Sequence, residues 1–171
     1  MRAMRWLCFL RSLADNVMSV RVQTEDFDVS QEMLALRQKN PKVGAVASFV
    51  GVVRDLNDGD EVSTLTLEHY PGMTERSLEE IVSEAKSRWN IYDALIIHRV
   101  GTLLPLDQIV LVLVTSAHRC ESFKACEFLM DYLKTRAPFW KKEQTSSGER
   151  WVDARTTDSV AAMRWKNTDD E

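Results

Sequence analysis

The chain has 171 residues, of which 44% are hydrophobic and 28% are charged, and its formal net charge is -4. These values are typical of a globular protein with one domain and a real core, and the acidic balance argues against a general nucleic-acid-binding protein. No apolar run approaches the roughly 18 residues of a membrane span, and three cysteines without a CxxC pair favour a reducing cytoplasm.

Residues 1–17 resemble a signal peptide only in part, because Arg11 interrupts their short apolar stretch. We therefore expect a disordered leader there, or a start near Met18, rather than export. A single domain over 18–155 and a polar C-terminal tail over 156–171 complete the predicted organisation.

Regular patterning begins with a half-buried strand over 20–22, where apolar and polar residues alternate. A short helix follows over 30–40, with Ser30 placed to cap it and Leu34 on its buried face. The apolar, β-branched run 43–53 predicts a strand that is buried on both faces.

A polar loop containing Asp58-Gly59 separates that strand from residues 62–70, which alternate again and should pair antiparallel with it. The next helix, over 75–89, has Thr74 placed to cap it. Its apolar stripe consists of Leu78, Ile81, Val82, Ala85 and Trp89.

Two further strands, 94–101 and 108–117, precede a helix over 121–136 that Pro138 prevents from continuing. The predicted buried face of this helix consists of Phe123, Cys126, Met130 and Leu133. A hairpin follows, formed by 139–144 and 150–155 with Gly148 in its turn. Strands and helices in this order predict an α+β fold, and the absence of a GxGxxG loop argues against a doubly wound dinucleotide-binding sheet.

The stretch "YLKTRAPFWKKE" gathers four cations in an acidic chain: Lys134, Arg136, Lys141 and Lys142. The first two can complement the helix dipole, worth ~0.3–1 kcal/mol each, but the last two lie beyond the proline. Strand alternation sends Lys141 and Lys142 to opposite faces, so only one of them joins Lys134. Cations without matching acids repel one another, and a bound anion would offset that repulsion.

Other cations stand at predicted loop edges. His118 and Arg119 lie where a strand gives way to a helix, a place where backbone N–H groups favour an anion, and Arg54 begins a polar loop. Taken alone, each of them is more often a solvated surface residue than a ligand-binding one. The spacing of His118, Cys120 and Cys126 matches no zinc pattern, so we expect no metal and no other cofactor. Together these residues predict binding of a phosphorylated small molecule.

The blocks "GVVRD", "LTLEHYPGMTE", "VTSAHRCESFKACEFLMDYLKTRAPFWKKE" and "RWVDAR" resemble the large, catalytic subunit of molybdopterin synthase, in consistent order from Val43 to Arg155. The resemblance implies an α/β hammerhead-like mixed sheet with helices and a small antiparallel β lobe. It also implies a sulfurtransferase of molybdenum cofactor biosynthesis, which converts cyclic pyranopterin monophosphate into molybdopterin by installing a dithiolene.

Partners follow from the same resemblance. The sulfur would come from the C-terminal Gly-Gly thiocarboxylate of a small ubiquitin-like subunit. Two large subunits would form the central dimer of a heterotetramer, without nucleic acid or membrane. By matching motif, Lys134 and Lys141 are the expected catalytic residues. The expected substrate-binding residues are Arg54, His118, Arg119, Lys142, Glu143, Met130 and Arg155.

Two other functions use the same cations. A phosphohydrolase or transferase could act on a nucleotide-like anion, although it would usually need a metal or a carboxylate pair, and neither is evident. A noncatalytic module could instead bind an acidic, Gly-Gly-ended peptide tail.

Overall fold

The computed structural model of the chain describes residues 19–57, 59–152 and 156–166. Of the positions named above, residues 1–18, Asp58, Arg155 and the last part of the expected tail, 167–171, lie outside these ranges. In chain order the elements are β1 (Val20–Gln23), α2 (Val29–Gln38), β2 (Ala45–Val52), β3 (Leu56–Asn57), β4 (Asp60–His69), α3 (Met73–Arg88), β5 (Ile91–Arg99), β6 (Gly101–Leu103), β7 (Gln108–Ser116), α4 (Arg119–Arg136), β8 (Phe139–Thr145), β9 (Gly148–Val152) and α5 (Thr156–Met163). They form the α+β fold that the sequence predicts.

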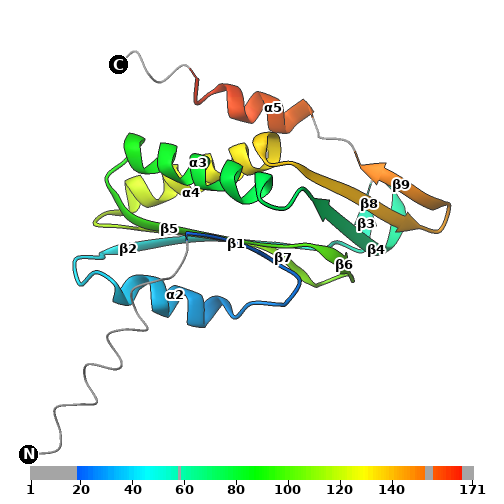
Figure 1. Ribbon diagram of the computed structural model, residues 1–171, viewed down its shortest axis with the longest axis horizontal. Helices are drawn as coiled ribbons and strands as arrows, with labels where there is room; N and C mark the ends of the chain where they lie inside the picture. The colour runs from blue at the N-terminus through cyan, green and yellow to red at the C-terminus, as the bar shows by residue number, and fades with distance from the viewer. Residues whose placement is uncertain (1–18, 58, 153–155, 167–171) are drawn as a thin grey trace, which may run out of the picture.

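The strands make two sheets. One is four-stranded, in the order β1-β5-β7-β2, and the other runs β3-β4-β8-β9 with β6 paired to β4. Helix α2 lies on one face of the first sheet, while α3 and α4 lie on the other (Figure 1). The second sheet is the antiparallel lobe at the right of the same view.

The core lies on both faces of the two central strands, β5 and β7. Because side chains alternate along a strand, Ile96 and Val112 pack with residues of α3 and α4, whereas Leu95 and Leu111 pack with Leu36 of α2. These four strand residues have essentially no exposed surface. Burial on both faces explains why β5 and β7 read as continuous apolar runs.

Strand β2 corrects two of the predictions. It is an edge strand that pairs antiparallel with β7, and Phe49 and Val52 are 41% and 46% exposed, so burial on both faces is wrong. Its predicted pairing with residues 62–70 is also wrong, because β4 pairs with β3, β6 and β8. A tight β3–β4 hairpin, with Gly59 at φ 91°, turns the chain into the second sheet instead.

Both helix caps differ from their predicted positions. The carboxylate of Asp28, not the hydroxyl of Ser30, caps α2, since it accepts hydrogen bonds from the N–H groups of Ser30 and Gln31 at 2.8 and 3.0 Å. Thr74 lies inside α3, where its buried hydroxyl donates to the carbonyl of Tyr70 at 3.0 Å. Residues 29 and 73 therefore begin helices that we expected to begin later.

The buried faces of α2 and α4 differ in part from the predicted ones. Leu34 is 41% exposed while Leu36 is buried in α2, and Phe123 at the start of α4 is 64% exposed. The buried residues of α4 are Ser122, Ala125, Cys126, Phe128, Leu129, Tyr132 and Leu133. The sheet below and α5 above both bury α4, which widens its buried face beyond a single stripe.

Helix α5 is an addition to the predicted elements, in the segment that we expected to be a polar tail. It packs on α4 (Figure 1). Trp165, just after the helix, is buried. The indole N–H of Trp165 donates to the carboxylate of Asp131 at 2.7 Å. Its ring meets those of Phe128 and Trp89 edge to face at 5.6 and 5.5 Å.

Candidate functional site

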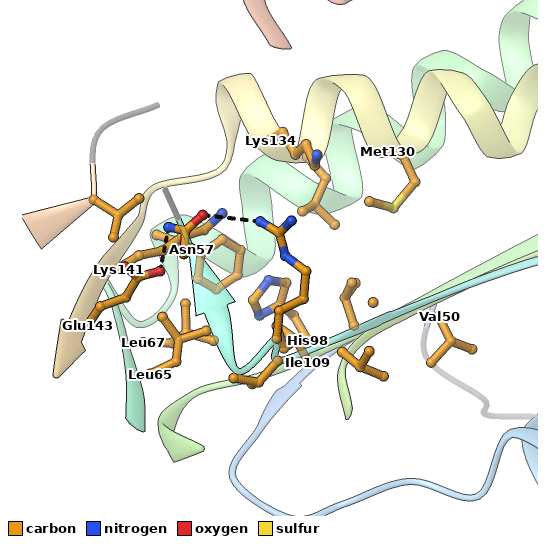
Figure 2. A pocket seen from close by; sticks show the side chains of 18 of the residues that line it. Val50, Asn57, Leu65, Leu67, His98, Ile109, Met130, Lys134, Lys141 and Glu143 are labelled. Carbon is orange, nitrogen blue, oxygen red and sulfur yellow. Dashed lines mark hydrogen bonds between the residues drawn. The ribbon is translucent and has the colours of Figure 1, made fainter. Parts of the chain in front are cut away.

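A cavity of about 580 Å³ lies between the two sheets, below the C-terminal half of α4 (Figure 2). Its walls come from β2, β5 and β7 of the first sheet, from β3, β4, β8 and β9 of the second, and from α4 and α5, so it exists only where the second sheet meets the first. Apolar side chains such as Leu65, Leu67 and Ile109 form much of the lining. The polar and charged groups in the lining are Arg54, Asn57, His98, Lys134, Lys141, Glu143 and Asp158.

Lys134 and Lys141 reach this cavity from different elements. Lys134 stands in the last turns of α4, and Ala137 then adopts an extended conformation, as the residue before a proline should. That turn sends the chain back as β8, which carries Lys141. The ammonium group of Lys134 is 3.5 Å from the carboxylate of Asp158 in α5, and its side chain is 44% exposed. The fold thus brings together the two lysines expected to be catalytic.

Lys142 points away from the cavity, as strand alternation predicts, and is not part of its lining. Its ammonium group pairs with the carboxylate of Glu149 at 3.1 Å and lies 5.8 Å from the centroid of the Trp151 ring. The charge of Lys142 is therefore already balanced by a neighbouring carboxylate and stabilised by an aromatic ring.

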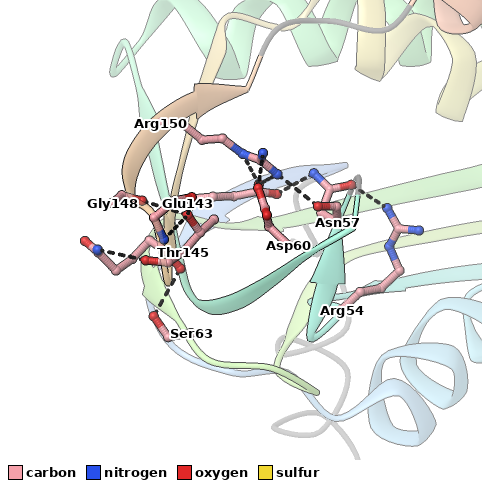
Figure 3. Close-up of polar contacts among 10 residues, drawn as sticks. Arg54, Asn57, Asp60, Ser63, Glu143, Thr145, Gly148 and Arg150 are labelled. Carbon is pink, nitrogen blue, oxygen red and sulfur yellow. Dashed lines mark hydrogen bonds and ion pairs between the residues drawn. The ribbon is translucent and has the colours of Figure 1, made fainter.

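Arg54 and Glu143 belong to one hydrogen-bonded network (Figure 3). Arg54 donates to the side-chain oxygen of Asn57 at 3.1 Å, and Asn57 donates to Glu143 at 2.8 Å. The second oxygen of Glu143 accepts from Arg150 at 3.0 and 3.2 Å. Glu143, which we expected to contact substrate, is buried with both oxygens engaged by protein groups.

His118 and Arg119 do not line the cavity in the single chain. They are exposed at the start of α4, fifteen residues before Lys134, which is roughly 22 Å along the helix. Met130, on the same helix, does line the cavity beside Lys134. Within one chain the structure thus unites Arg54, Met130 and the two lysines, and leaves the His118-Arg119 pair apart.

His98 is a cavity residue that the sequence did not identify as part of a site. His98 is 3% exposed as a residue. Its ring stacks on that of Phe139, with centroids 3.8 Å apart, and Nδ1 is 2.8 Å from the carbonyl oxygen of Arg99. Burial lowers the pKa of His98 to about 4, and the positive charge of Lys141 acts in the same direction, so the ring is neutral at pH 7. Its strand pattern gave no signal for this role, because the cavity depends on the second sheet.

Within the described part of the chain, no cluster of three or more His, Cys, Asp or Glu side chains has the geometry to bind a metal ion. In the same ranges no helix has the length and apolar character needed to span a membrane.

The protein is thus an α+β protein with a cavity between its two sheets, and the cations in the lining of that cavity suit it to an anionic small molecule. A family model described as MoaE protein matches residues 22–136, and the chain belongs to this family. That membership confirms the family that the sequence motifs indicated.

Individual relatives agree in sequence and in fold. The molybdopterin synthase catalytic subunit of Ralstonia nicotianae is 63% identical over 147 residues, which cover 86% of this chain and 84% of the relative. The solved molybdopterin biosynthesis MoaE protein from Burkholderia ambifaria has 59% identity and a TM-score of 0.76, covering 88% of this chain and 99% of its own. A complex of subunits 1 and 2 of molybdopterin-converting factor from Helicobacter pylori shares the fold at 19% identity, with a TM-score of 0.67 over 81% and 92% of the chains.

Proposed function

We propose that this chain is the catalytic subunit of a molybdopterin synthase and acts in molybdenum cofactor biosynthesis. It converts cyclic pyranopterin monophosphate into molybdopterin, with sulfur from the C-terminal thiocarboxylate of a small ubiquitin-like subunit. The observation that carries the proposal is the meeting of Arg54, Lys134 and Lys141 in one cavity of a chain from this family. We place the reaction in the cytoplasm, since the cysteine pattern indicates a reducing compartment.

The cations of the cavity walls reduce the electrostatic repulsion between the two anionic reactants. A cyclic phosphate and a thiocarboxylate are both anions, and two unit charges 4 Å apart repel by about 4 kcal/mol at an effective dielectric constant near 20. Fixed ammonium and guanidinium groups on the walls oppose that repulsion, and they do so without reorganising during the reaction. Apolar lining such as Leu65 and Leu67 excludes water and strengthens these interactions.

The two lysines have complementary tasks. One ammonium group donates a proton to the oxygen that leaves the substrate and stabilises the anionic intermediate. The other binds the terminal carbonyl of the partner's tail and holds its sulfur near the pterin. Arg54 holds the phosphate at the cavity rim. At each of two positions the thiocarboxylate sulfur forms a C–S bond with the substrate while the protonated oxygen leaves. Water then cleaves the bond between that sulfur and the acyl carbon of the tail, so each of two small subunits departs with a C-terminal carboxylate.

A second copy of the chain completes the site. His118 and Arg119 lie roughly 22 Å from Lys134 along α4, too far to share a substrate with it in one chain. The exposed edge of β2 runs from Ala45, paired with Ser116, to Val52, close to Arg54. Two such edges in antiparallel contact bring the His118-Arg119 end of one copy to the Arg54 end of the other. The proposed assembly is this central dimer, with a small subunit at each end.

Activity should depend on Lys134 and not on other lysines of the same helix. Protein, thiocarboxylated small subunit and cyclic pterin are mixed, and dithiolene formation is measured. Lys134→Ala should abolish product while melting temperature and partner affinity stay near those of the wild type. Lys124→Ala is the matched control, because Lys124 is an exposed residue of α4 outside the cavity lining. Near-normal turnover by Lys134→Ala would discard the assignment, and metal-dependent phosphate release would favour a phosphohydrolase.

Complementation tests the shared site. Lys134→Ala and Arg119→Ala should each be inactive alone. Mixed at equal amounts with exchange of subunits, they should recover about a quarter of wild-type activity, because half of the dimers then contain one intact site of two. No recovery despite demonstrated exchange would show that Arg119 does not act across a dimer.

A further inference from the structure

A relay of hydrogen bonds runs from Arg150 in β9 to Arg54 at the cavity (Figure 3). The guanidinium of Arg150 donates from Nε and Nη2 to one oxygen of Glu143, at 3.2 and 3.0 Å. The other oxygen of Glu143 accepts from Nδ2 of Asn57 at 2.8 Å, and Oδ1 of Asn57 accepts from Nη2 of Arg54 at 3.1 Å. Two segments that are distant in sequence, residues 54–57 and the β8–β9 hairpin, thereby meet to fix one guanidinium.

The chemistry of the partners allows only one orientation of the Asn57 amide. An ionised carboxylate only accepts hydrogen bonds, and a guanidinium only donates them. The NH₂ group of Asn57 must therefore face Glu143, and its oxygen must face Arg54. Asn57 and Glu143 are each 7% exposed, so water does not compete strongly for these contacts.

Arg150 secures the other end of the relay. Besides Glu143, it binds the backbone carbonyl of Asn57 through Nη2 at 3.0 Å and the carboxylate of Asp60 through Nη1 at 2.9 Å. It thus ties the β3–β4 hairpin to β8 and compensates the buried charge of Glu143. Without Arg150, the carboxylate of Glu143 would lack this counter-charge, and the backbone carbonyl of Asn57 would lose this hydrogen bond.

Arg54 itself needs this support, because its side chain is exposed at the cavity rim. A free arginine loses side-chain entropy when a ligand orders it. A contact that fixes the guanidinium beforehand removes part of that loss. Among the described residues, the side chain of Arg54 makes one hydrogen bond, to Asn57. The other N–H groups of its guanidinium are therefore available to an anion.

We infer that Asn57 and Arg150 are positioning residues, which act through Glu143 and Arg54 on the anionic group of the substrate. The identity of that anion rests on the proposed function, whereas the relay itself does not. The side-chain amide of Asn57 and the guanidinium of Arg150 are engaged by protein groups, so in this inference neither residue contacts the substrate. Glu143 acts in the same way, so its expected substrate contact is replaced by an indirect role.

A double-mutant cycle on ligand affinity tests the inference. The dissociation constants of cyclic pyranopterin monophosphate and of inorganic phosphate are measured for the full chain by calorimetry. Asn57→Ser and Arg150→Gln should each raise the constant about tenfold, since each breaks a charge-assisted contact in the relay. In an Arg54→Ala background, the same changes should alter it less than about twofold, because the group that they position is gone.

Three further variants separate positioning from folding. Arg150→Lys keeps the positive charge but loses the two-pronged guanidinium, so it should raise the dissociation constants less than Arg150→Gln does. This variant also replaces Asn57→Ser in the cycle if Asn57→Ser does not fold. Arg76→Gln, an exposed arginine of α3, is the control and should leave both constants unchanged. Equal effects with and without Arg54, or no Arg54-dependent binding of either anion, would overturn the inference. If the wild type makes no dithiolene but the coupling persists with inorganic phosphate, only the proposed function fails.

Discussion

His98 should make the stability of this protein depend on pH in a defined window. Its pKa falls from 6.5 to about 4 because the folded protein buries the ring. The unfolded chain therefore takes up a proton first as the solution is acidified, and protonation favours unfolding. The stabilisation is fully present above pH 6.5 and is lost as the pH falls from 6.5 to 4. A gap of this size corresponds to roughly 3 kcal/mol.

The perturbation is His98→Gln, which keeps a hydrogen-bond donor for the carbonyl of Arg99 but does not titrate. At pH 7.5 the variant should be less stable than the wild type, since it loses the stacking on Phe139. Between pH 7.5 and 4.5 the wild type should lose roughly 2 to 3 kcal/mol more than the variant does. Carboxylates that titrate in the same range contribute to both proteins and cancel in the comparison.

Urea unfolding at fixed protein concentration, repeated from pH 7.5 to 4.5, measures this difference. His118→Gln is the matched control, because it removes a histidine whose side chain is exposed. Parallel pH profiles for the wild type and His98→Gln would refute the reasoning. An NMR titration of the folded protein with a His98 midpoint near 6.5 would refute it independently.

Three more outcomes follow from the packing. Lys142→Ala should keep dithiolene formation within about threefold of the wild type, because Lys142 lies outside the cavity lining and its surface ion pair with Glu149 contributes at most about 1 kcal/mol to stability. A loss of activity equal to that of Lys134→Ala would contradict the strand alternation. Trp165→Ala should lower the free energy of unfolding by about 3 kcal/mol in urea titrations, as other buried tryptophans do, and a change under about 0.5 kcal/mol would show that α5 is not docked. Iodoacetamide at pH 8 should modify exposed Cys120 but not Cys126, whose pKa burial raises to about 11, as peptide mass spectrometry would show.

Much of the fold could be predicted because its strongest signals are local. The central residues of β5 (94–97) and of β7 (109–114) are continuously apolar and β-branched in part, and α3 carries one clear apolar stripe, so local composition and spacing identify these elements. The partner of a strand is not a local property. Residues 43–53 have the composition of a central strand, yet β2 lies at an edge, and a two-residue β3 decides where β4 goes.

The same distinction applies to the site. Lys134 and Lys141 could be expected to meet because one turn at Pro138 joins their two elements. His98 and Asn57 could not, because each becomes a cavity residue only when the second sheet folds against the first. The His118-Arg119 pair shows the reverse case: the motif points to function, but one chain does not place it beside the lysines.

The cations at the cavity differ from the neighbouring cations outside it in how closely a carboxylate approaches them. Outside the cavity, Lys142 and Arg136 each have a carboxylate close by, at 3.1 and 2.8 Å. At the cavity, Lys134 has one only at 3.5 Å, and Arg54 is held by the neutral amide of Asn57. A carboxylate in place of that amide would fix the guanidinium equally well but would cancel its charge. Placing Glu143 one residue further along the relay keeps the orientation and leaves the positive charge for an incoming anion.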